Sequence, residues 1–368
     1  MRIICDTQKL TEVCLNVQRC IPNRSVMPHL ECILIRTLPE GKIELKGFNL
    51  DLGIVTQMDV RVEQPGAVVL NAKTFCDALR EMPEDTVSID SDEKNVVTLK
   101  SGDLDYTMMS LTPEEYPELP TVTEQTPLRV SQKLLKNMIR QTIFAVSVEE
   151  SKTVHRGVKF EVSPGTLRLV ALDGFRLAIR TEFIEYNGKE FKFVVPAKTL
   201  NEIVKFITDD DEFIDLIVGR RHIRFEIAGY SIISRLLEGE FLDYRSAVPT
   251  AKSTVVRVNT SVMISCLDRV AVMVAEKMKS PVKMIFDEDT VKLSVVSALG
   301  GGNTKFNASI DGKRTEIGFN NRYMSEALRS CESDEVLINL NGPFAPAVIV
   351  PTQGDSFLYL ILPVKIKN

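Results

Sequence analysis

The amino-acid sequence predicts an α+β protein built from three repeated domains, each with two helices packed on antiparallel sheet. Three observations lead to this fold class. They are the length of 368 residues, a segment that recurs at near-constant spacing, and proline-containing polar stretches between the recurrences. A chain of this length exceeds the usual size of one hydrophobic core, so two or three domains are expected. The hydrophobic content of 44% and charged content of 26% are typical of a soluble globular protein.

The recurring segment is a strand-like run that leads through a small or turn-forming residue into a short amphipathic helix. Lys73, Lys198 and Arg322 hold the same place in its three copies, at separations of 125 and 124 residues. After each helix come an acidic turn and another strand, at residues 86–89, 212–217 and 335–340. A fixed period of this kind indicates repeated structural units. We therefore predict three domains, spanning 1–125, 126–250 and 251–368.

A second helix is expected to open each third, at about residues 6–20, 131–146 and 260–275. In the middle one, Leu135, Met138 and Ile139 fall on one face at helical spacing, and Ser131 is suited to cap its amino end. Polar stretches that contain proline, at 117–127 and 249–253, are expected to link the thirds.

Basic residues recur on the predicted helices. Each copy of the repeat carries two of them seven residues apart, which places both on the same helix face: Lys73 and Arg80, Lys198 and Lys205, Arg322 and Arg329. The middle opening helix adds Lys133, Lys136 and Arg140, which we expect opposite its apolar face. The whole chain carries a net charge of −5, but the six predicted helical windows together carry +6: 6–24, 71–82, 131–145, 196–208, 260–280 and 320–332. This distribution suits helices that face phosphates while the rest of the surface repels them, but solvated helix faces are the alternative.

The sequence offers no sign of base recognition, of a metal site or of a cofactor. There is no helix-turn-helix, zinc finger or aromatic stacking platform, so any DNA contact is expected to be to the backbone. His29, His155 and His222 are isolated from one another, without metal-ligand spacing. The seven cysteines form no C-x-x-C pair and are expected to be reduced thiols, mostly buried, in a cytoplasmic protein. We expect neither a signal peptide nor a membrane span.

Four strings carry a family resemblance. They read Ala-Leu-Asp-Gly-Phe-Arg-Leu-Ala at 171–178, Ser-Arg-Leu-Leu-Glu-Gly-Glu-Phe-Leu-Asp-Tyr at 234–244, Ile-Gly-Phe-Asn-Asn-Arg-Tyr at 317–323 and Leu-Pro-Val-Lys-Ile at 362–366. Together, in this order and spacing, they resemble the bacterial β sliding clamp family, the processivity subunit of DNA polymerase III. The match extends over essentially the whole chain.

The resemblance implies a head-to-tail homodimer that closes a ring around duplex DNA, with helices lining the central hole and no catalysis. The implied partners are double-stranded DNA, the replicative DNA polymerase, the clamp loader and other proteins with a clamp-binding motif. The positions that match the family's dimer contact are Tyr106, Met108, Val272 and Met273. Arg24 matches a DNA-contacting position on the loop after the first helix. Our further candidates for the lining of the hole are Lys73, Arg80, Lys136, Arg140, Lys198 and Lys205.

The resemblance also implies a peptide-binding groove between the second and third domains. The matching residues are Leu172, Gly174, Phe175, Arg176, Leu177, Leu242, Ala247, Pro346, Leu360, Leu362, Pro363 and Val364. Apolar side chains would wall a pocket for the anchor of an extended peptide, Gly174 would allow close backbone approach, and Arg176 is expected to donate from the rim. Leu172 and Leu242 depart from the threonine and proline usual there, and the tail continues through Lys367 and Asn368, which leaves the preferred peptide open.

Two functions of other classes stay open from the residues alone. One is a transferase that acts on a phosphate-bearing substrate, with an active site between globular halves. The other is an interaction scaffold that never touches DNA. Against the transferase, the sequence contains neither G-x-x-x-x-G-K-[ST] nor G-x-S-x-G, and the glycines at 300–302 have the wrong spacing from Lys305. Catalytic groups can still be brought together by folding.

Overall fold

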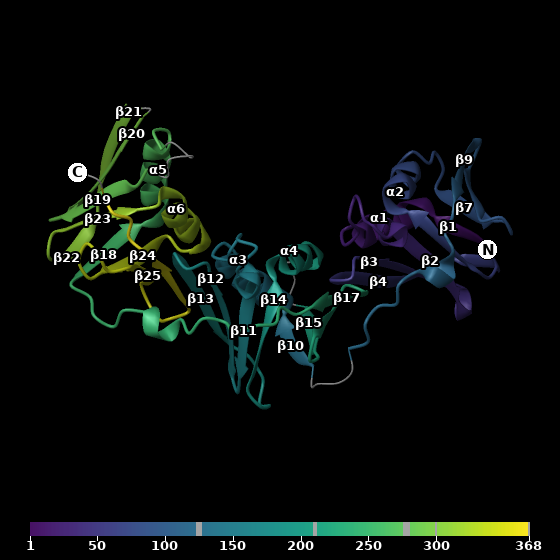
Figure 1. Ribbon diagram of the computed structural model, residues 1–368, viewed down its shortest axis with the longest axis horizontal. Helices are drawn as coiled ribbons and strands as arrows, with labels where there is room; N and C mark the ends of the chain where they lie inside the picture. Colours follow the sequence, from purple (N-terminus) through teal and green to yellow (C-terminus); the bar gives the residue numbers. More distant parts are fainter. Residues whose placement is uncertain (123–126, 209–211, 275–279, 299, 367–368) are drawn as a thin grey trace. The chain divides into compact units, whose positions relative to one another are not determined.

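The computed structural model describes residues 1–122, 127–208, 212–274, 280–298 and 300–366 (Figure 1). The chain divides into two compact units, each assembled from two stretches of sequence. The first comprises residues 1–132 and 201–236, and the second comprises residues 133–200 and 237–368. Strand pairing among the described residues is antiparallel throughout.

The first unit holds two sheets. The smaller has the order β5 (Arg61–Gln64), β1 (Arg2–Asp6), β7 (Thr86–Ser91), β8 (Val96–Ser101), β9 (Leu104–Met109). The larger has the order β10 (Leu128–Ser131), β15 (Phe213–Val218), β16 (His222–Ile227), β17 (Tyr230–Arg235), β4 (Leu52–Asp59), β3 (Lys42–Phe48), β2 (Cys32–Leu38), β6 (Ala67–Asn71).

Two helices of the first unit, α1 (Thr7–Gln18) and α2 (Ala72–Arg80), pack against each other and on these sheets. Each begins where a side chain can accept its first free N–H groups. The Asp6 carboxylate accepts from the Lys9 N–H at 2.8 Å, and the Asn71 amide oxygen accepts from the Thr74 N–H at 3.1 Å. Apolar residues at helical spacing then bury one face of each helix.

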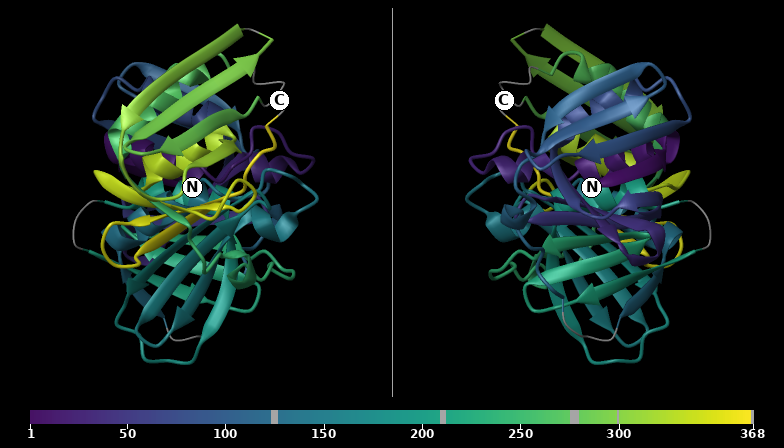
Figure 2. Two further views of the ribbon diagram at one scale, coloured as in Figure 1. Left: turned by 90° about the vertical axis from the view of Figure 1, so that its left-hand side faces the viewer. Right: turned by 90° about the vertical axis from the view of Figure 1, so that its right-hand side faces the viewer.

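The second unit also holds two sheets. The larger has the order β14 (Phe191–Pro196), β11 (Gly157–Ser163), β12 (Thr166–Leu172), β13 (Arg176–Phe183), β26 (Phe357–Ile361), β25 (Ala347–Pro351), β24 (Glu335–Leu340), β18 (Thr254–Asn259), β22 (Ser309–Gly312). The smaller has the order β21 (Gly300–Asn307), β20 (Thr290–Ser297), β19 (Val282–Asp287), β23 (Thr315–Phe319). The β20–β21 hairpin projects from the body of the unit (Figures 1 and 2).

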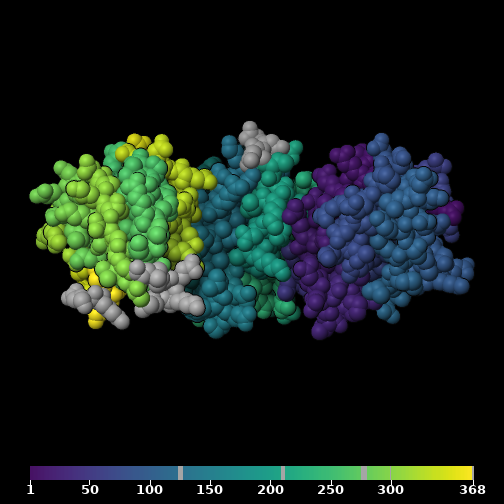
Figure 3. All heavy atoms as spheres, turned by 90° about the horizontal axis from the view of Figure 1, so that it is seen from above, coloured from purple at the N-terminus to yellow at the C-terminus, as the bar shows by residue number. Residues whose placement is uncertain are grey.

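The nine-stranded sheet of the second unit has a helix-covered face and an opposite face. On the covered face, the Tyr359 ring of β26 packs edge-on against Phe144, which follows α3 (Gln132–Ile143), and its hydroxyl donates to the Ser330 carbonyl of α6 (Asn321–Ser330). The helix α5 (Thr260–Ala271) packs on α6 and on β21. Residues of α5 and α6 are visible at the surface in Figure 3. We call the opposite face of this sheet the open face, and it carries the candidate site.

Sheets from successive thirds of the sequence are joined edge to edge within each unit. Strand β17 pairs with β4 in the first unit, and β13 pairs with β26 in the second. The strands of the middle third are therefore shared between the units, and its helix α4 (Ala197–Phe206) contributes residues to both. Among the described residues, each third supplies two α-helices, as predicted. The domain boundaries at 125/126 and 250/251 stay predictions, and the first falls outside the described residues.

The remaining described elements are short 3₁₀ turns. They are η1 (Pro28–Glu31), η2 (Pro39–Gly41), η3 (Pro113–Glu115), η4 (Thr153–Arg156) and η5 (Arg245–Ala247). Among the described residues, no helix combines the length and the apolar content needed to cross a membrane.

Candidate peptide-binding groove and basic helix faces

The open face of the nine-stranded sheet carries a compact apolar cluster. The strand register aligns Leu172 with Leu177, Leu177 with Leu360, and Leu360 with Val348, in a row across four strands. Residues directly opposite one another on antiparallel strands share a face, so these side chains pack together. Val170 and the ring of Tyr244 complete the cluster, whose members are nearly inaccessible to solvent.

The chain between β17 and β18 passes over this face. Its Tyr244 ring is buried in the cluster, while Phe241 and Val248 pack at the edges. Beside the cluster a cavity of about 210 Å³ is lined by this segment and by strands β24 to β26. Its residues are Val248, Pro249, Thr250, Ala251, Lys252, Asn339, Asn341, Pro346, Val348, Val350 and Leu358.

Several of the predicted groove residues meet at one end of this face. Leu172, Leu177 and Leu360 form the floor, and Pro346 lines the cavity. The Leu362 N–H donates to the Phe175 carbonyl at 2.9 Å, which fixes the carboxyl-terminal segment beside the turn between β12 and β13. Pro363 and Val364 continue this segment half-buried, and the Val364 N–H donates to the Gly318 carbonyl.

The turn between β12 and β13 depends on a glycine and presents an aromatic ring. Gly174 has φ +94°, a conformation that L side chains rarely adopt, so glycine is required there. Phe175 next to it is 52% exposed, Leu242 is 54% exposed, and Ala247 in η5 is exposed. Floor residues that are buried, together with exposed apolar residues around them, are what an apolar peptide anchor needs.

Arg176 does not lie at an open rim, and this part of the prediction is corrected. Its side chain is only 5% exposed, and its Nε donates to the Asp173 carboxylate at 3.1 Å. Its Nη1 donates to Glu326 of α6, and the guanidinium lies 4.3 Å from the centre of the Tyr323 ring. Because side chains alternate along a strand, Leu177 faces the apolar cluster and Arg176 faces the helices. Arg176 therefore ties β13 to α6.

His155 supports the segment that carries Leu242. Its ring packs edge-on against Phe241, 5.0 Å between centres, and its Nε2 accepts the Leu242 N–H at 3.4 Å. Burial, and after it the positive charge of Lys152, lowers the pKa of His155 below its ordinary value. The neutral ring needed to accept this hydrogen bond is thus favoured at neutral pH.

This geometry predicts a contribution of His155 to the pH dependence of stability. In the unfolded chain His155 takes up a proton near pH 6.5, and in the folded chain it does so only at lower pH. In that interval the unfolded state holds more protons, so stability falls as the pH is lowered from about 7. Urea unfolding at pH 7.5 and 5.5 should show a smaller loss for His155→Gln than for the unaltered chain. An equal loss in both proteins would contradict this assignment.

The predicted pairs of basic residues are exposed in all three copies of the repeat. Lys73 and Arg80 lie on α2, Lys198 and Lys205 on α4, and Arg322 and Arg329 on α6. Several pair with nearby acids: Arg80 with Asp77 at 2.9 Å, Lys205 with Glu202 at 2.8 Å, and Arg329 with Asp268 at 2.7 Å. Exposed ion pairs of this kind are weak, so a phosphate can compete for these cations.

Lys136 does not share the exposed face predicted for it. It is 7% exposed, whereas Lys133 and Arg140 on the same helix α3 are exposed, as is Arg24 after α1. The reason is the helical spacing of α3. Lys136 lies three residues before the fully buried Ile139 and four before the exposed Arg140, so it stands at the edge of the buried stripe, where packing covers it. Lys136 is therefore withdrawn as a candidate for contact with DNA.

The four predicted dimer-contact residues lie at or beside sheet edges, and none is core. Tyr106 and Met108 are half-buried on β9, the edge strand of the five-stranded sheet. Val272, 72% exposed, and half-buried Met273 follow α5. Met273 packs near Gly302 of β21, the edge strand of the four-stranded sheet. Their part in self-association stays a prediction.

Sequence reasoning missed the residues contributed by the covering segment and by β25. Tyr244 and Val348 belong to the cluster and Val248 packs against it, but none of the three was predicted as a site residue. The available signal was the pair of aromatic residues, Phe241 and Tyr244, in the connection between β17 and β18. Among the described residues, no group of three or more His, Cys, Asp and Glu side chains could hold a metal ion.

Comparison with known proteins gives one consistent result. Models of the amino-terminal, central and carboxyl-terminal domains of the DNA polymerase III beta subunit match residues 1–120, 129–243 and 245–365. The beta sliding clamp of Halalkalibacterium halodurans is 31% identical over 379 residues, covering 99% of this chain and 100% of that protein. The solved Bacillus subtilis DNA polymerase sliding clamp is 28% identical, with a TM-score of 0.96 over 100% of both chains. A DNA polymerase III beta subunit structure from Eubacterium rectale is 33% identical, with a TM-score of 0.95 over 99% of both chains.

The fold defines a class: three similar modules, each with two helices on antiparallel sheet, joined edge to edge through their strands. Within that class the comparisons are specific, because they extend along nearly the whole chain. This chain belongs to the DNA polymerase III beta subunit family, and its curated relatives include beta sliding clamps.

Proposed function

We propose that this chain is the processivity subunit of a replicative DNA polymerase and acts as a ring that slides on duplex DNA. The observation that carries this proposal is an exposed basic pair at the same place on α2, α4 and α6, in a member of this family. The protein is non-catalytic and works in the cytoplasm. Seven buried cysteines, none of them in a disulfide, suit that reducing compartment.

In this function the basic helix faces hold DNA loosely. Lysine and arginine contacts to phosphates carry no sequence information, and each is weakened by salt. Local acids such as Asp77 and Glu202 already occupy some of these cations, which limits how tightly any one phosphate is held. A ring held by topology needs contacts that exchange easily, because strong contacts would stop it from sliding.

Ring closure requires a second copy of the chain. We infer a head-to-tail contact in which the surface around Tyr106 and Met108 of one chain meets the surface around Val272 and Met273 of the other. A head-to-tail contact closes a ring when the rotation between copies is right. The edge strands β9 and β21 expose unpaired backbone groups that such a contact can satisfy.

The groove supplies the tether. An extended peptide from the polymerase or the clamp loader inserts an apolar anchor over Leu177 and Leu360, between Phe175, Leu242 and Leu362. A polymerase held in this way stays at high effective concentration near the primer end after each dissociation. The peptide contact and the DNA contact are therefore separate, and each can be tested alone.

The test of the proposed function is retention on DNA of defined topology. Light scattering should give about 82 kDa, twice the 41.2 kDa of one chain. After loading by a clamp loader, the protein should remain on nicked circular DNA through gel filtration and be lost when the circle is linearised. The same mass of linear DNA from the start is the matched control.

Other outcomes separate the alternatives. A transferase that binds phosphate groups would be retained equally on circular and linear DNA, and a DNA-independent scaffold would be retained on neither. A strict monomer at micromolar concentration would also contradict the ring.

A further inference from the structure

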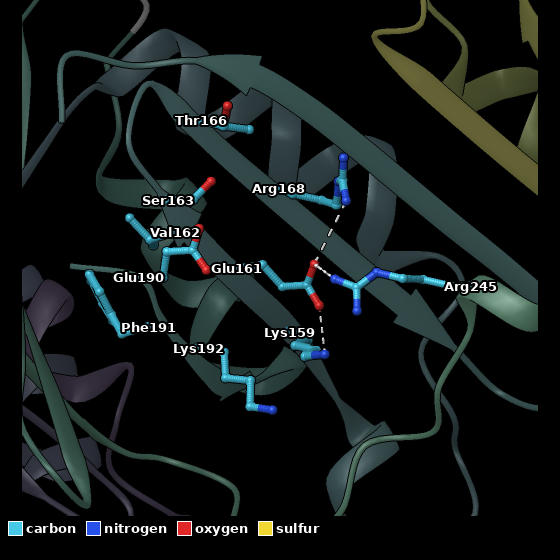
Figure 4. Close-up of a pocket in the computed structure, with 10 residues that line it drawn as sticks. All are labelled: Lys159, Glu161, Val162, Ser163, Thr166, Arg168, Glu190, Phe191, Lys192 and Arg245. Atoms are coloured by element: carbon cyan, nitrogen blue, oxygen red, sulfur yellow. Dashed lines mark hydrogen bonds and ion pairs between the residues drawn. The ribbon is translucent and has the colours of Figure 1, made fainter. Parts of the chain in front are cut away.

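A second, polar pocket lies on the same open face of the nine-stranded sheet, next to the apolar cluster. Its volume is about 570 Å³, and strands β11 and β12, the start of β14, and Arg245 of η5 line it (Figure 4). The residues that matter are Lys159, Glu161, Arg168, Lys192 and Arg245. None of these residues has a part in the function proposed above.

Three cations surround one carboxylate in this pocket. Glu161 lies 2.6 Å from Lys159 Nζ, 3.2 Å from Arg245 Nη2 and 3.9 Å from Arg168 Nη1 (Figure 4). It also accepts a hydrogen bond from the Tyr244 hydroxyl at 2.9 Å. Burial raises the pKa of Glu161, but the hydrogen bonds from Lys159 and Tyr244 outweigh it, so the pKa is lowered overall. Glu161 is thus a fully paired anion at neutral pH.

The pocket keeps an excess of positive charge after this pairing. Its lining holds four cations, including Lys192, and two acids, Glu161 and Glu190, which leaves +2 in a chain whose net charge is −5. Each guanidinium has five N–H donors, and the side chains of Arg168 and Arg245 are 37% and 64% exposed. Donors therefore remain for an added anion, and two carboxylates would neutralise the excess.

The pocket continues directly from the proposed groove. The register aligns Lys159 with Val170 of the cluster and Glu161 with Arg168, so these side chains share the face of the apolar row. Tyr244 belongs to both sites, because its ring packs in the cluster while its hydroxyl bonds Glu161. Strand β11 lies two strands from β13, a distance of about 10 Å that some three extended residues can span.

We propose that this pocket binds an acidic segment that flanks the apolar anchor of a partner peptide held in the groove. The inference rests on the proposed function. A protein carboxylate is favoured over a nucleic-acid phosphate because the pocket shares a face with the apolar cluster. In this unit, the helices α3 and α6 lie on the opposite face.

The test compares peptides by fluorescence anisotropy. The probe is the labelled clamp-binding segment of the replicative polymerase, alone or extended at either end by Gly-Ser and two glutamates or two lysines. In low salt, one glutamate extension should bind about five-fold tighter than the unextended peptide, the gain expected from one or two exposed ion pairs. The gain should vanish in 0.5 M salt and in the Arg168→Gln, Arg245→Gln double variant. Arg257→Gln removes a comparably exposed arginine of the same unit and should keep the gain.

The outcomes distinguish this inference from the proposed function. If the unextended peptide does not bind, the groove itself is wrong. If it binds but neither glutamate extension improves binding, the acidic-segment inference alone is overturned. A gain that survives in the double variant, or one that the lysine extension matches, overturns it as well. A further contrary outcome is that a single-stranded oligonucleotide binds, loses this binding in the double variant, and the glutamate extensions give no gain. The pocket would then bind phosphate, and the inference would be overturned.

Discussion

Replacing Arg176 with alanine is expected to lower the free energy of unfolding of the second unit by about 3 kcal/mol, the lower end of the range for breaking a buried ion pair. The Arg176 side chain is 5% exposed, and it pairs with Asp173 and Glu326 at the same time. Its removal leaves the Asp173 carboxylate, itself 11% exposed, without its cation. The lower end applies because Glu326 is 36% exposed and water can solvate it.

Arg322→Ala is the matched control for this prediction. Arg322 contacts the same Glu326 at 3.5 Å, but its side chain is 66% exposed. An exposed pair of this kind contributes less than about 1 kcal/mol. Urea unfolding followed by circular dichroism measures both variants, and the second unit should unfold first in Arg176→Ala. Equal losses in the two variants would show that burial does not govern the effect.

Removing the exposed apolar residues of the groove is expected to weaken partner-peptide binding without unfolding the protein. In the double variant Phe175→Ala, Leu362→Ala, the affinity should fall about 100-fold, as expected when two anchor contacts are lost. Both side chains are substantially exposed, at 52% and 37%, so little core packing is lost. Titration calorimetry with the polymerase peptide measures the affinity, and a thermal melt checks the fold.

The control for the groove variant is Val296→Ala on the β20–β21 hairpin. Val296 is 82% exposed and belongs to the four-stranded sheet, away from the open face of the larger one. Its replacement should leave both the affinity and the melting temperature unchanged. If Phe175→Ala, Leu362→Ala also binds the peptide normally, the anchor does not lie between these residues.

The repeat of the sequence was sufficient to predict the fold class. Basic residues at 73, 198 and 322 mark equivalent helices because each helix must present a polar face to water and an apolar face to its sheet. That requirement is local and repeats with the chain, so the number of helices in each third and their exposed pairs could be predicted. The first family string then predicted the turn at Gly174 and the buried residues Leu172 and Leu177, and the resemblance as a whole added Leu360.

Tertiary structure alone decided which side chains face the apolar cluster and which face the helices. Arg176 and Leu177 are neighbours in sequence, yet strand alternation turns one toward α6 and the other toward the open face. Lys136 has a charged side chain of the kind that is usually solvated, but the packing of α3 buries it. The basic pocket depends on the pairing of β11 with β12. It also depends on Arg245, which lies 77 residues after Arg168 in the sequence but lines the same pocket. The register between strands far apart in the sequence determines these contacts, and local sequence patterns do not reveal that register.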